Sequence, residues 1–288
     1  MIKKIYVLIL MMVLLITGCN SNTNQHNATE PKMKTVPEQS NVRNLDQSRG
    51  NIRVLNTEVD NYYKEAVGKT GAELKQILHE IISKQDVIDY RGQQMWDALG
   101  DTDQDPNDPS KVMLLYAGRS VSKSNHGSQW NKEHVWAQYH GEFGRTRGIG
   151  SDLHNLKPED PDVNRDRGHR NFDESADDYN GNRAPDTKWD ADSWEPRDEV
   201  KGDIARIILY MDTRYEDTDR MDLKVVDSSP MDNSEPQHGK LSTLLKWHEE
   251  DPVDDFERRR NNVIFEKYQH NRNPFIDHPE WVAEVYNK

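Results

Sequence analysis

The segment 130–168 constrains the fold more than any other part of this 288-residue chain. Residues 130–136 and 152–156 predict two short strands, and a loop rich in glycine and arginine, 141–150, separates them. The polar stretch 161–168 predicts a short helix directly after the second strand. We expect the strands to pair antiparallel, so that the polar side chains of the whole segment gather in one place.

Apolar residues at helical spacing predict that most of the remaining chain is helical. Thr70 and Glu73 match a capping box at the start of the stretch 70–82, where leucine and isoleucine recur at i, i+3, i+4, i+7 and i+8. Three further helices are expected over 202–215, 241–248 and 256–268, and a last one begins at Pro279. The short apolar run 111–117 predicts a buried strand. The expected fold class is therefore α+β, mostly helical with a small antiparallel strand pair.

The helix expected over 202–215 is predicted to bury one face only. Ile204, Ile207, Ile208 and Met211 share a face at helical spacing. We place Arg206 and Asp212 on the opposite, exposed face. Substituting Arg206 is accordingly expected to leave the chemistry of the protein intact.

The first 55 residues are expected to lie outside the folded domain. A charged start, an apolar run and small residues before Cys19 are typical of a secretion signal over residues 1–19, which is too short for a comfortable membrane span. Residues 20–55 are polar and predict a disordered linker or pro-segment. Residues 56–288 then form a single folded domain of a secreted, extracellular protein.

Cys19 is the only cysteine of the chain. The residues that end in it, Ile16-Thr17-Gly18-Cys19, resemble the lipobox of bacterial lipoproteins, which would put a lipid on Cys19 and tether the protein to a membrane. The alternative is a plain signal peptide that is cleaved there or later. In either case the domain has no internal disulfide and no thiolate metal site, so its stability depends on its core.

The charge of the chain is unevenly distributed. The net charge is −13, yet residues 119–172 hold nine basic and seven acidic side chains, a balance of +2 that leaves −15 on the remainder. The segment can therefore bind phosphate while the acidic remainder keeps the protein soluble. This balance favours weak, non-processive contact with a nucleic acid over tight coating of it.

Glu133, His134 and Asn164 are the candidate catalytic and metal-binding residues. Histidine has a pKa near neutrality and is the usual general base. A carboxylate and an amide oxygen are hard ligands that suit Mg²⁺, with Mn²⁺ or Ca²⁺ as alternatives. With several cations nearby, this set predicts hydrolysis of a phosphodiester by a water that His134 deprotonates.

The geometry of this set raises two expectations. Neighbouring residues of a regular strand point to opposite faces, so Glu133 and His134 share a site only if the strand ends or twists there. A backbone carbonyl near His154 or Asn155 is expected to accept the second ring N–H of His134 and select its tautomer.

The motifs NKEHVW (131–136), SDLHNLKP (151–158) and VNRDRGHRNF (163–172) resemble the bacterial endonuclease I family of secreted, non-specific nucleases. Later segments such as KGDIARIILYMDTRY resemble its Gram-positive extracellular ribonuclease branch. The resemblance covers nearly all of 56–288. It implies a mixed domain that contains a ββα-metal (His-Me) finger, and no stable protein partner.

The resemblance also implies site residues and a substrate. It matches His134 to the general base, and Glu133 and Asn164 to the Mg²⁺ ligands. The substrate is expected to be RNA, with DNA left open because a water nucleophile needs no 2′-hydroxyl. The products carry 5′-phosphates, and base specificity is expected to be low.

Other polar residues of the segment are expected to bind substrate or support the site. Either Arg145 or Arg147 matches the phosphate-binding arginine of the family, and Arg119 and Arg167 are further candidates for substrate contacts. The supporting residues are expected to be Asp152, His154 and Asn155. Among the aromatic residues, Trp130, Trp136 and Tyr139 could stack on unpaired bases.

The chain departs from the family in two respects. Well-studied members carry disulfides, which this domain lacks. Some members have a glutamate two residues before the aspartate of DLHNL, where this chain has Gly150. We therefore assign no general acid.

Two other functions fit the sequence less well. A zinc protease needs His-Glu-x-x-His on a helix, whereas here glutamate precedes histidine. The alternative kept is a calcium-binding extracellular module without catalysis, because Asp160, Asp162, Asn164 and Asp166 alternate as in an EF-hand loop. The glycine and glutamate that such a loop requires are missing.

Overall fold

A computed structural model of the chain describes residues 58–288, apart from 180, 219–220, 232–234 and 288. The expected signal, the lipid attachment at Cys19 and the whole expected linker, 20–55, lie outside the described residues. The helices include α2 (Gly71–Ile82), α3 (Gln93–Thr102), α4 (Pro161–Arg167), α5 (Lys201–Arg214), α6 (Leu241–Glu250), α7 (Asp255–Lys267), α8 (Pro274–Asp277) and α9 (Trp281–Tyr286). The strands include β1 (Gln104–Asp105), β2 (Asp108–Met113), β3 (Ser120–Ser122), β4 (Asn131–His134), β5 (Leu156–Glu159), β6 (Asn171–Phe172), β7 (Asp177–Asp178), β8 (Lys188–Trp189), β9 (Ser193–Glu195), β10 (Lys224–Val225) and β11 (Gln237–His238).

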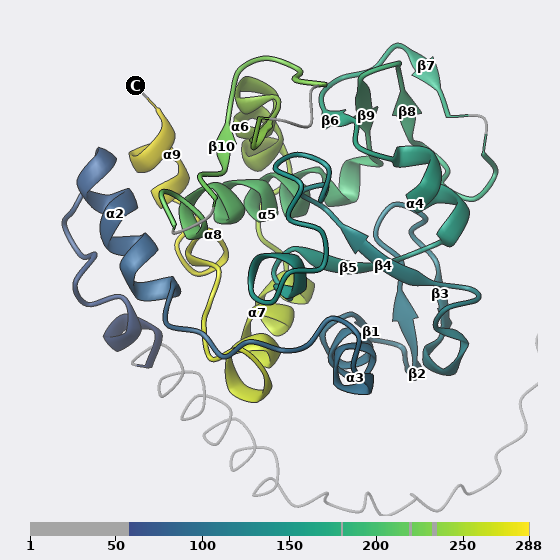
Figure 1. The fold of residues 1–288 in the computed structure, drawn as a ribbon, viewed down its shortest axis with the longest axis horizontal. Coiled ribbons are helices and arrows are strands. Elements are labelled where there is room, and N and C mark those ends of the chain that lie inside the picture. The colour runs from purple at the N-terminus through teal and green to yellow at the C-terminus, as the bar shows by residue number, and fades with distance from the viewer. Residues whose placement is uncertain (1–57, 180, 219–220, 232–234, 288) are drawn as a thin grey trace, which may run out of the picture. The chain divides into compact units, whose positions relative to one another are not determined.

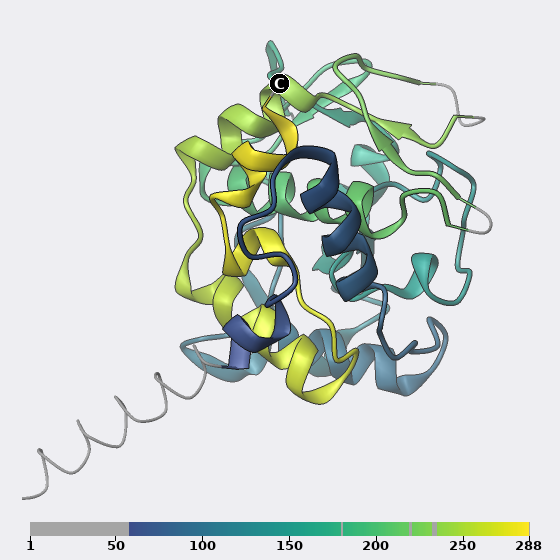
Figure 2. The ribbon, with the colours of Figure 1, turned by 90° about the vertical axis from the view of Figure 1, so that its left-hand side faces the viewer.

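Helix α5 runs through the middle of this architecture, and every residue from Gly202 to Thr213 is buried (Figure 1). Helices α6, α2 and α8 all pack against it. Figure 2 shows α2, in dark blue, beside the yellow C-terminal helices, and α2 and α9 are in contact. The main apolar core lies around α5 and is contributed by these helices and by the strands beside them.

The prediction that α5 exposes Arg206 and Asp212 is wrong. Arg206 has no exposed surface, and its guanidinium donates to both carboxylate oxygens of Glu257 at 2.7 and 2.6 Å. Asp212 is 2% exposed and accepts a hydrogen bond from Tyr286 at 2.6 Å, beside Lys75 at 2.8 Å. Helices cover both faces of α5, so its charged residues are buried and paired.

Helix α2 forms where the sequence predicts it, but without the expected capping box. Thr70 is the N-cap residue, and its side chain makes no capping hydrogen bond. Glu73 instead pairs with Lys69, one helical turn before it. The helix is stabilised mainly by burial of Leu74, Leu78 and the isoleucines at its end.

Strands β4 and β5 form the expected antiparallel pair, and α4 follows directly (Figure 1). The register places His134 opposite Leu156 and Asn131 opposite Glu159. The expected strand over 152–156 is wrong except for its last residue, because the carboxylate of Asp152 accepts from the N–H of His154 at 2.9 Å and forms a turn there. The strand–strand–helix order of the segment is as predicted.

The buried strand expected over 111–117 ends earlier than predicted. Strand β2 stops at Met113, although residues 114–117 are all buried. The backbone N–H of Leu115 bonds to the carbonyl of Pro158, and that of Tyr116 bonds to the carboxylate of Glu159 at 2.5 Å. The buried residues after β2 therefore contact β5 through these hydrogen bonds but do not extend the strand.

The remaining strands form small sheets around the periphery. Strands β1, β2 and β3 form an antiparallel sheet, β6, β9, β8 and β7 a mixed four-stranded sheet, and β10 and β11 a parallel pair. No helix among the described residues is both long enough and apolar enough to cross a membrane. Helices and small sheets together agree with the expected α+β class.

Candidate active site

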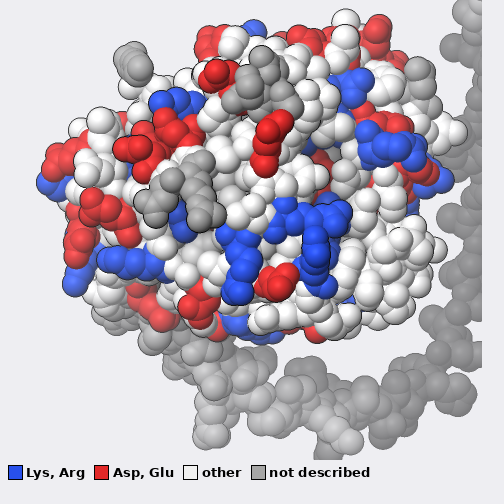
Figure 3. Space-filling view, viewed as in Figure 1, with Lys and Arg blue, Asp and Glu red and all other residues white. Residues whose placement is uncertain are grey.

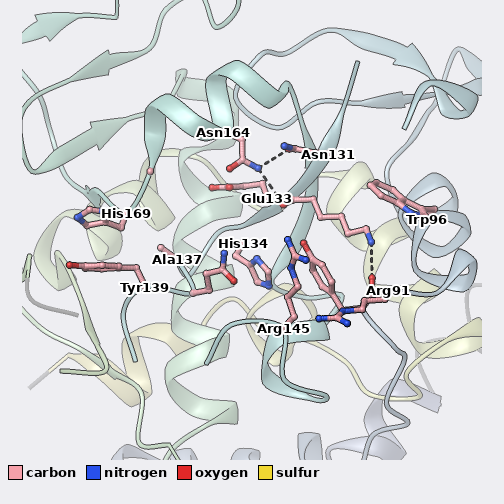
Figure 4. Close-up of a pocket in the computed structure, with 14 residues that line it drawn as sticks. Arg91, Trp96, Asn131, Glu133, His134, Ala137, Tyr139, Arg145, Asn164 and His169 are labelled. Atoms are coloured by element: carbon pink, nitrogen blue, oxygen red, sulfur yellow. Dashed lines mark hydrogen bonds between the residues drawn. The ribbon is translucent and has the colours of Figure 1, made fainter. Parts of the chain in front are cut away.

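A cavity of about 570 Å³ opens where β4 ends and α4 passes beside it (Figure 4). Strand β4 contributes Glu133 and His134 to its wall, and α4 contributes Asn164. The structure thus brings the predicted base and both predicted metal ligands to one pocket.

The amide of Asn164 is oriented by two hydrogen bonds. Its Nδ2 donates to Oδ1 of Asn131 at 2.8 Å and to the carbonyl of Lys132 at 3.3 Å. The amide oxygen is therefore turned toward the cavity, which Glu133 also lines (Figure 4). A carboxylate oxygen and an amide oxygen presented together match the ligand chemistry of a hard divalent cation.

Glu133 is buried and held from the side opposite the pocket. Its Oε1 accepts from the hydroxyl of Tyr116 at 2.8 Å and from the guanidinium of Arg167 at 3.1 Å. Burial raises the pKa of Glu133 to about 7, although Arg167 and Tyr116 act in the opposite direction. A cation beside the carboxylate would lower that pKa and favour the charged form.

His134 presents one free ring nitrogen. Its Nε2 lies 3.0 Å from the carbonyl oxygen of Gly150, and a carbonyl only accepts, so Nε2 carries the proton. The expectation of a backbone carbonyl partner is confirmed, but its predicted position near His154 or Asn155 is wrong. Burial lowers the pKa of His134 to about 4, which keeps the ring neutral and leaves Nδ1 able to accept a proton.

The end of β4 explains how neighbouring residues share one site. The ladder with β5 ends at His134, which is the last residue of the strand. The ring of His134 lies parallel to that of Tyr90, with centroids 5.4 Å apart. Glu133 and His134 consequently line the same cavity. This agrees with the expectation that they can share a site only if the strand ends or twists there.

Position 150 has no room for a side chain. A Cβ atom on Gly150 would lie 2.6 Å from the carbonyl oxygen of Gly144 and 2.9 Å from the Cα of Arg145. The loop backbone packs directly on this glycine, whose carbonyl holds His134. The glutamate that some family members carry here is excluded by the loop itself.

The structure distinguishes between the predicted substrate-binding arginines. Arg145 lines the cavity, with its guanidinium carbon 5.1 Å from the ring centroid of Tyr90. Arg147 lies outside the cavity and donates to the carbonyl of Val87 at 3.4 Å. Arg119 is also outside it and pairs with Asp160 at 2.5 Å.

Arg167 does not reach the cavity surface, so the prediction that it contacts substrate is wrong. It is fully buried and donates to the carbonyls of His134 at 3.0 Å and Val135 at 2.7 Å, in addition to Glu133. These bonds join α4 to the end of β4. Arg167 therefore positions the site from within the protein.

Two cations of the cavity were missed by sequence reasoning. Lys132 and Arg91 both line it beside Arg145, and Glu133 is the only acidic residue among the described residues that do. Lys132 Nζ donates to the carbonyl of Tyr90 at 2.7 Å. Figure 3 shows lysine and arginine side chains gathering near the middle of this face. The lining is thus positive in a chain of net charge −13.

The three predicted supporting residues lie behind the site, and none lines the cavity. Asp152 accepts from the hydroxyls of Tyr210 at 2.9 Å and Tyr215 at 2.8 Å. His154 is 1% exposed and packs beside Tyr210. Asn155 holds the chain that follows His134, because its side chain accepts from the N–H of Trp136 at 2.7 Å and donates to the carbonyl of the same residue at 3.2 Å.

The tryptophans proposed to stack on bases belong to the core, since Trp130 and Trp136 have no exposed surface. Tyr139 is 38% exposed and lines the cavity together with His169. His169 gave no distinctive signal in the sequence, because one histidine in a polar loop is common on protein surfaces.

The residues of the apparent EF-hand loop have other partners. Asp160 caps α4 by accepting from the N–H of Asp162 at 2.9 Å, and it also pairs with Arg119 and Arg183. Across the described part of the chain, no group of three or more His, Cys, Asp or Glu side chains is arranged to hold a metal ion. These contacts explain the alternation of acidic residues without a calcium loop.

Comparison with known proteins identifies the family of this chain. A family model described as Endonuclease I matches residues 70–280. The extracellular ribonuclease of Bacillus subtilis (strain 168) is 51% identical over 233 residues, which are 80% of this chain and 79% of that protein. The extracellular ribonuclease of Bacillus amyloliquefaciens shows the same identity and coverage.

The fold, the site and these similarities define a nuclease, a hydrolase of nucleic acids. The chain belongs to the endonuclease I family, and its similarity to the two Bacillus enzymes confirms the predicted branch of Gram-positive extracellular ribonucleases.

Proposed function

We propose that this protein is a secreted, Mg²⁺-dependent endonuclease that hydrolyses RNA, and DNA by the same chemistry, with low sequence specificity and 5′-phosphate products. The observation that supports the proposal is that His134, with Nδ1 free, lines one cavity together with Glu133, Asn164 and three basic residues. The names of the two Bacillus relatives support secretion and favour RNA as substrate.

His134 acts as the general base in this proposal. Its neutral ring, with the proton held on Nε2 by Gly150, accepts a proton from the attacking water at Nδ1. The attack breaks the bond between phosphorus and the 3′-oxygen, which leaves the phosphate on the 5′ side of the next nucleotide. Because water is the nucleophile, the 2′-hydroxyl takes no part, and the cut strand of either nucleic acid gives the same end groups.

Glu133 and Asn164 would hold the divalent cation, and Mn²⁺ or Ca²⁺ would meet the same oxygen ligands. The strand–strand–helix unit that presents them fits a ββα-metal finger. When bound, the cation supplies positive charge that polarises the phosphate and stabilises the leaving oxygen. The remaining work belongs to the protein, in which Arg145 binds the phosphate and Arg167 keeps Glu133 in place.

Digestion of RNA and DNA of matched sequence, with Mg²⁺ and with EDTA, tests this proposal. We expect hydrolysis only with the metal, and 5′-phosphate ends on every product. Cyclic 2′,3′-phosphates on the RNA products would contradict the water mechanism, because they form only when the 2′-hydroxyl attacks. Hydrolysis that survives EDTA would contradict the metal site.

A further inference from the structure

Two aromatic rings stack on each other at one end of the active-site cavity. The centroids of Tyr139 and His169 lie 4.0 Å apart with an interplanar angle of 27°, and both residues line the cavity. Figure 4 shows this pair at the end of the cavity opposite Trp96, with Glu133 and His134 between them. The pair therefore flanks the position where the phosphate is cut.

The pair is held in place by the same helix that carries Asn164. His169 follows Gly168, which ends α4 with a φ of 61°, a conformation that favours glycine and turns the chain back. The carbonyl of His169 accepts from Nε2 of the buried His140 at 2.7 Å, which fixes its backbone. His169 thus has a fixed position relative to Asn164, which lies five residues earlier in the chain.

Tyr139 differs from the aromatic residue at the other end of the cavity. It is 38% exposed, one of four large apolar side chains that are exposed in the described part of the chain. Trp96 is already in contact, with Nζ of Lys132 lying 3.8 Å from its ring centroid and the ring of His126 at 4.6 Å. Tyr139 therefore retains ring surface for a ligand, whereas Trp96 is used to hold protein groups.

We propose that Tyr139, supported by His169, is a stacking platform for an unpaired nucleobase beside the scissile phosphate. The inference rests on the proposed function and adds to it the strand state of the substrate. Base–aromatic stacking tolerates any base, because every base has a π-face, so the platform adds affinity without sequence preference. The cations Arg91, Lys132 and Arg145 complete the site, since a single strand offers phosphates alongside its bases.

A preference for single strands follows from this arrangement. A base in a duplex is already stacked on its neighbours and paired, so it must leave the helix before it can lie on Tyr139. We expect single-stranded oligonucleotides and unpaired loops to be hydrolysed faster than duplexes of the same sequence, whichever sugar they contain.

Variants at position 139 test the platform. Tyr139→Ala is expected to lower kcat/KM on a short single strand about tenfold, mainly through a higher KM. Tyr139→Phe keeps the ring and should retain near-parental kcat/KM. Val67→Ala, a trim of an apolar residue that is 69% exposed and outside the cavity, is the matched control for handling and folding.

Abasic substrates test the contact with the unaltered enzyme. A series of single strands, each lacking one base, should show a weakened cut at a constant distance from the missing base. Tyr139→Ala should lose this pattern, because no platform remains to distinguish the abasic site. A cut pattern in the unaltered enzyme that ignores the abasic position would overturn the platform while leaving the nuclease function intact. Failure to hydrolyse any oligonucleotide with Mg²⁺ would instead refute the proposed function, and the platform with it.

Discussion

Arg167 and Glu133 form a buried ion pair, with a guanidinium nitrogen 3.1 Å from Oε1 of the carboxylate. Arg167 lies three residues after Asn164 on α4, so both project from neighbouring positions of one helical face. One helix thus brings Asn164 to the cavity and a charged partner to Glu133. This relationship makes the distance between these two proposed metal ligands a property of α4 and not of a flexible loop.

His134→Ala is expected to lower kcat about a hundredfold to ten-thousandfold, because it removes the general base. The variant should still fold and bind Mg²⁺, since Glu133 and Asn164 have their own partners. Steady-state kinetics with a labelled oligonucleotide measures the loss, and metal binding can be followed by calorimetry. A variant with near-parental kcat would exclude His134 as the base.

Asn164→Ala is expected to raise the Mg²⁺ concentration needed for half-maximal activity, because one of the two oxygen ligands is lost. Glu133→Gln should act in the same direction. Asn125→Ala, which changes an asparagine outside the cavity, serves as the control. Identical Mg²⁺ titrations for Asn164→Ala and the parent protein would show that another residue holds the metal.

Arg145 and Arg147 offer a matched pair within one loop. Arg145→Ala is expected to lower kcat/KM about tenfold to a hundredfold, because a charge-assisted contact with phosphate is lost. Arg147→Ala removes the same charge two residues further on, outside the cavity, and should leave kcat/KM near the parental value. Equal losses in both variants would mean that general attraction, and not a specific contact, explains the role of the loop.

Arg206→Ala is expected to destabilise the fold by about 3–5 kcal/mol, because it leaves the buried carboxylate of Glu257 without a partner. Urea denaturation measures the change in the free energy of unfolding. Arg165→Ala is the control, since the side chain of Arg165 is 67% exposed and solvent screens its ion pairs, so that its removal should change stability little. A loss no larger than that of the control would contradict the buried pairing.

Buried His154 is expected to lower the free energy of unfolding in mild acid. Burial lowers its pKa to about 4, against an ordinary value of 6.5, so below pH 6.5 the unfolded chain binds a proton that the folded protein does not. The contribution of His154 to the free energy of unfolding should therefore fall between pH 6.5 and pH 4, by up to about 1.4 kcal/mol per pH unit, while the raised pKa values of Glu133 and Glu159 act in the opposite direction. His140, with a pKa also lowered to about 4 by burial, adds to the effect.

Urea denaturation at a series of pH values measures this slope. His154→Gln removes one titrating group and should flatten the dependence relative to the parent protein. An unchanged slope in that variant would assign the acid sensitivity to other groups.

Structural elements that depend on the order of residues close together in the chain could be predicted from the sequence. The apolar spacing of residues 71–82 predicts α2, and the segment from β4 to α4 has the predicted strand–strand–helix order. The start of β5 could not be predicted, because a hydrogen bond that the side chain of Asp152 accepts from the backbone N–H of His154 makes the turn that delays the strand. The periodicity of apolar residues indicates which residues share a face. It does not show where a side chain binds the backbone in place of a neighbouring strand.

Features that depend on contacts across the chain were missed. Arg206 looks like a surface residue of an amphipathic helix until Glu257, fifty-one residues later, is placed against it. The partner of His134 is a backbone carbonyl, which every residue possesses, so no residue type could identify Gly150. The roles proposed for His134, Glu133 and Asn164, by contrast, follow from the chemistry of their side chains, and the structure brings these three residues to one cavity.

The close packing at Gly150 links two parts of the proposed catalytic site mechanically. Its carbonyl orients the imidazole of His134, while the position that a Cβ would occupy is taken up by the backbone of Gly144 and Arg145. Any substituent grown at this point would displace the arginine-bearing loop and tilt the imidazole in the same movement. Engineers who wish to install a proton donor would therefore do better to approach the leaving oxygen from another wall of the cavity, where alignment of the base and grip on the phosphate can be tuned independently.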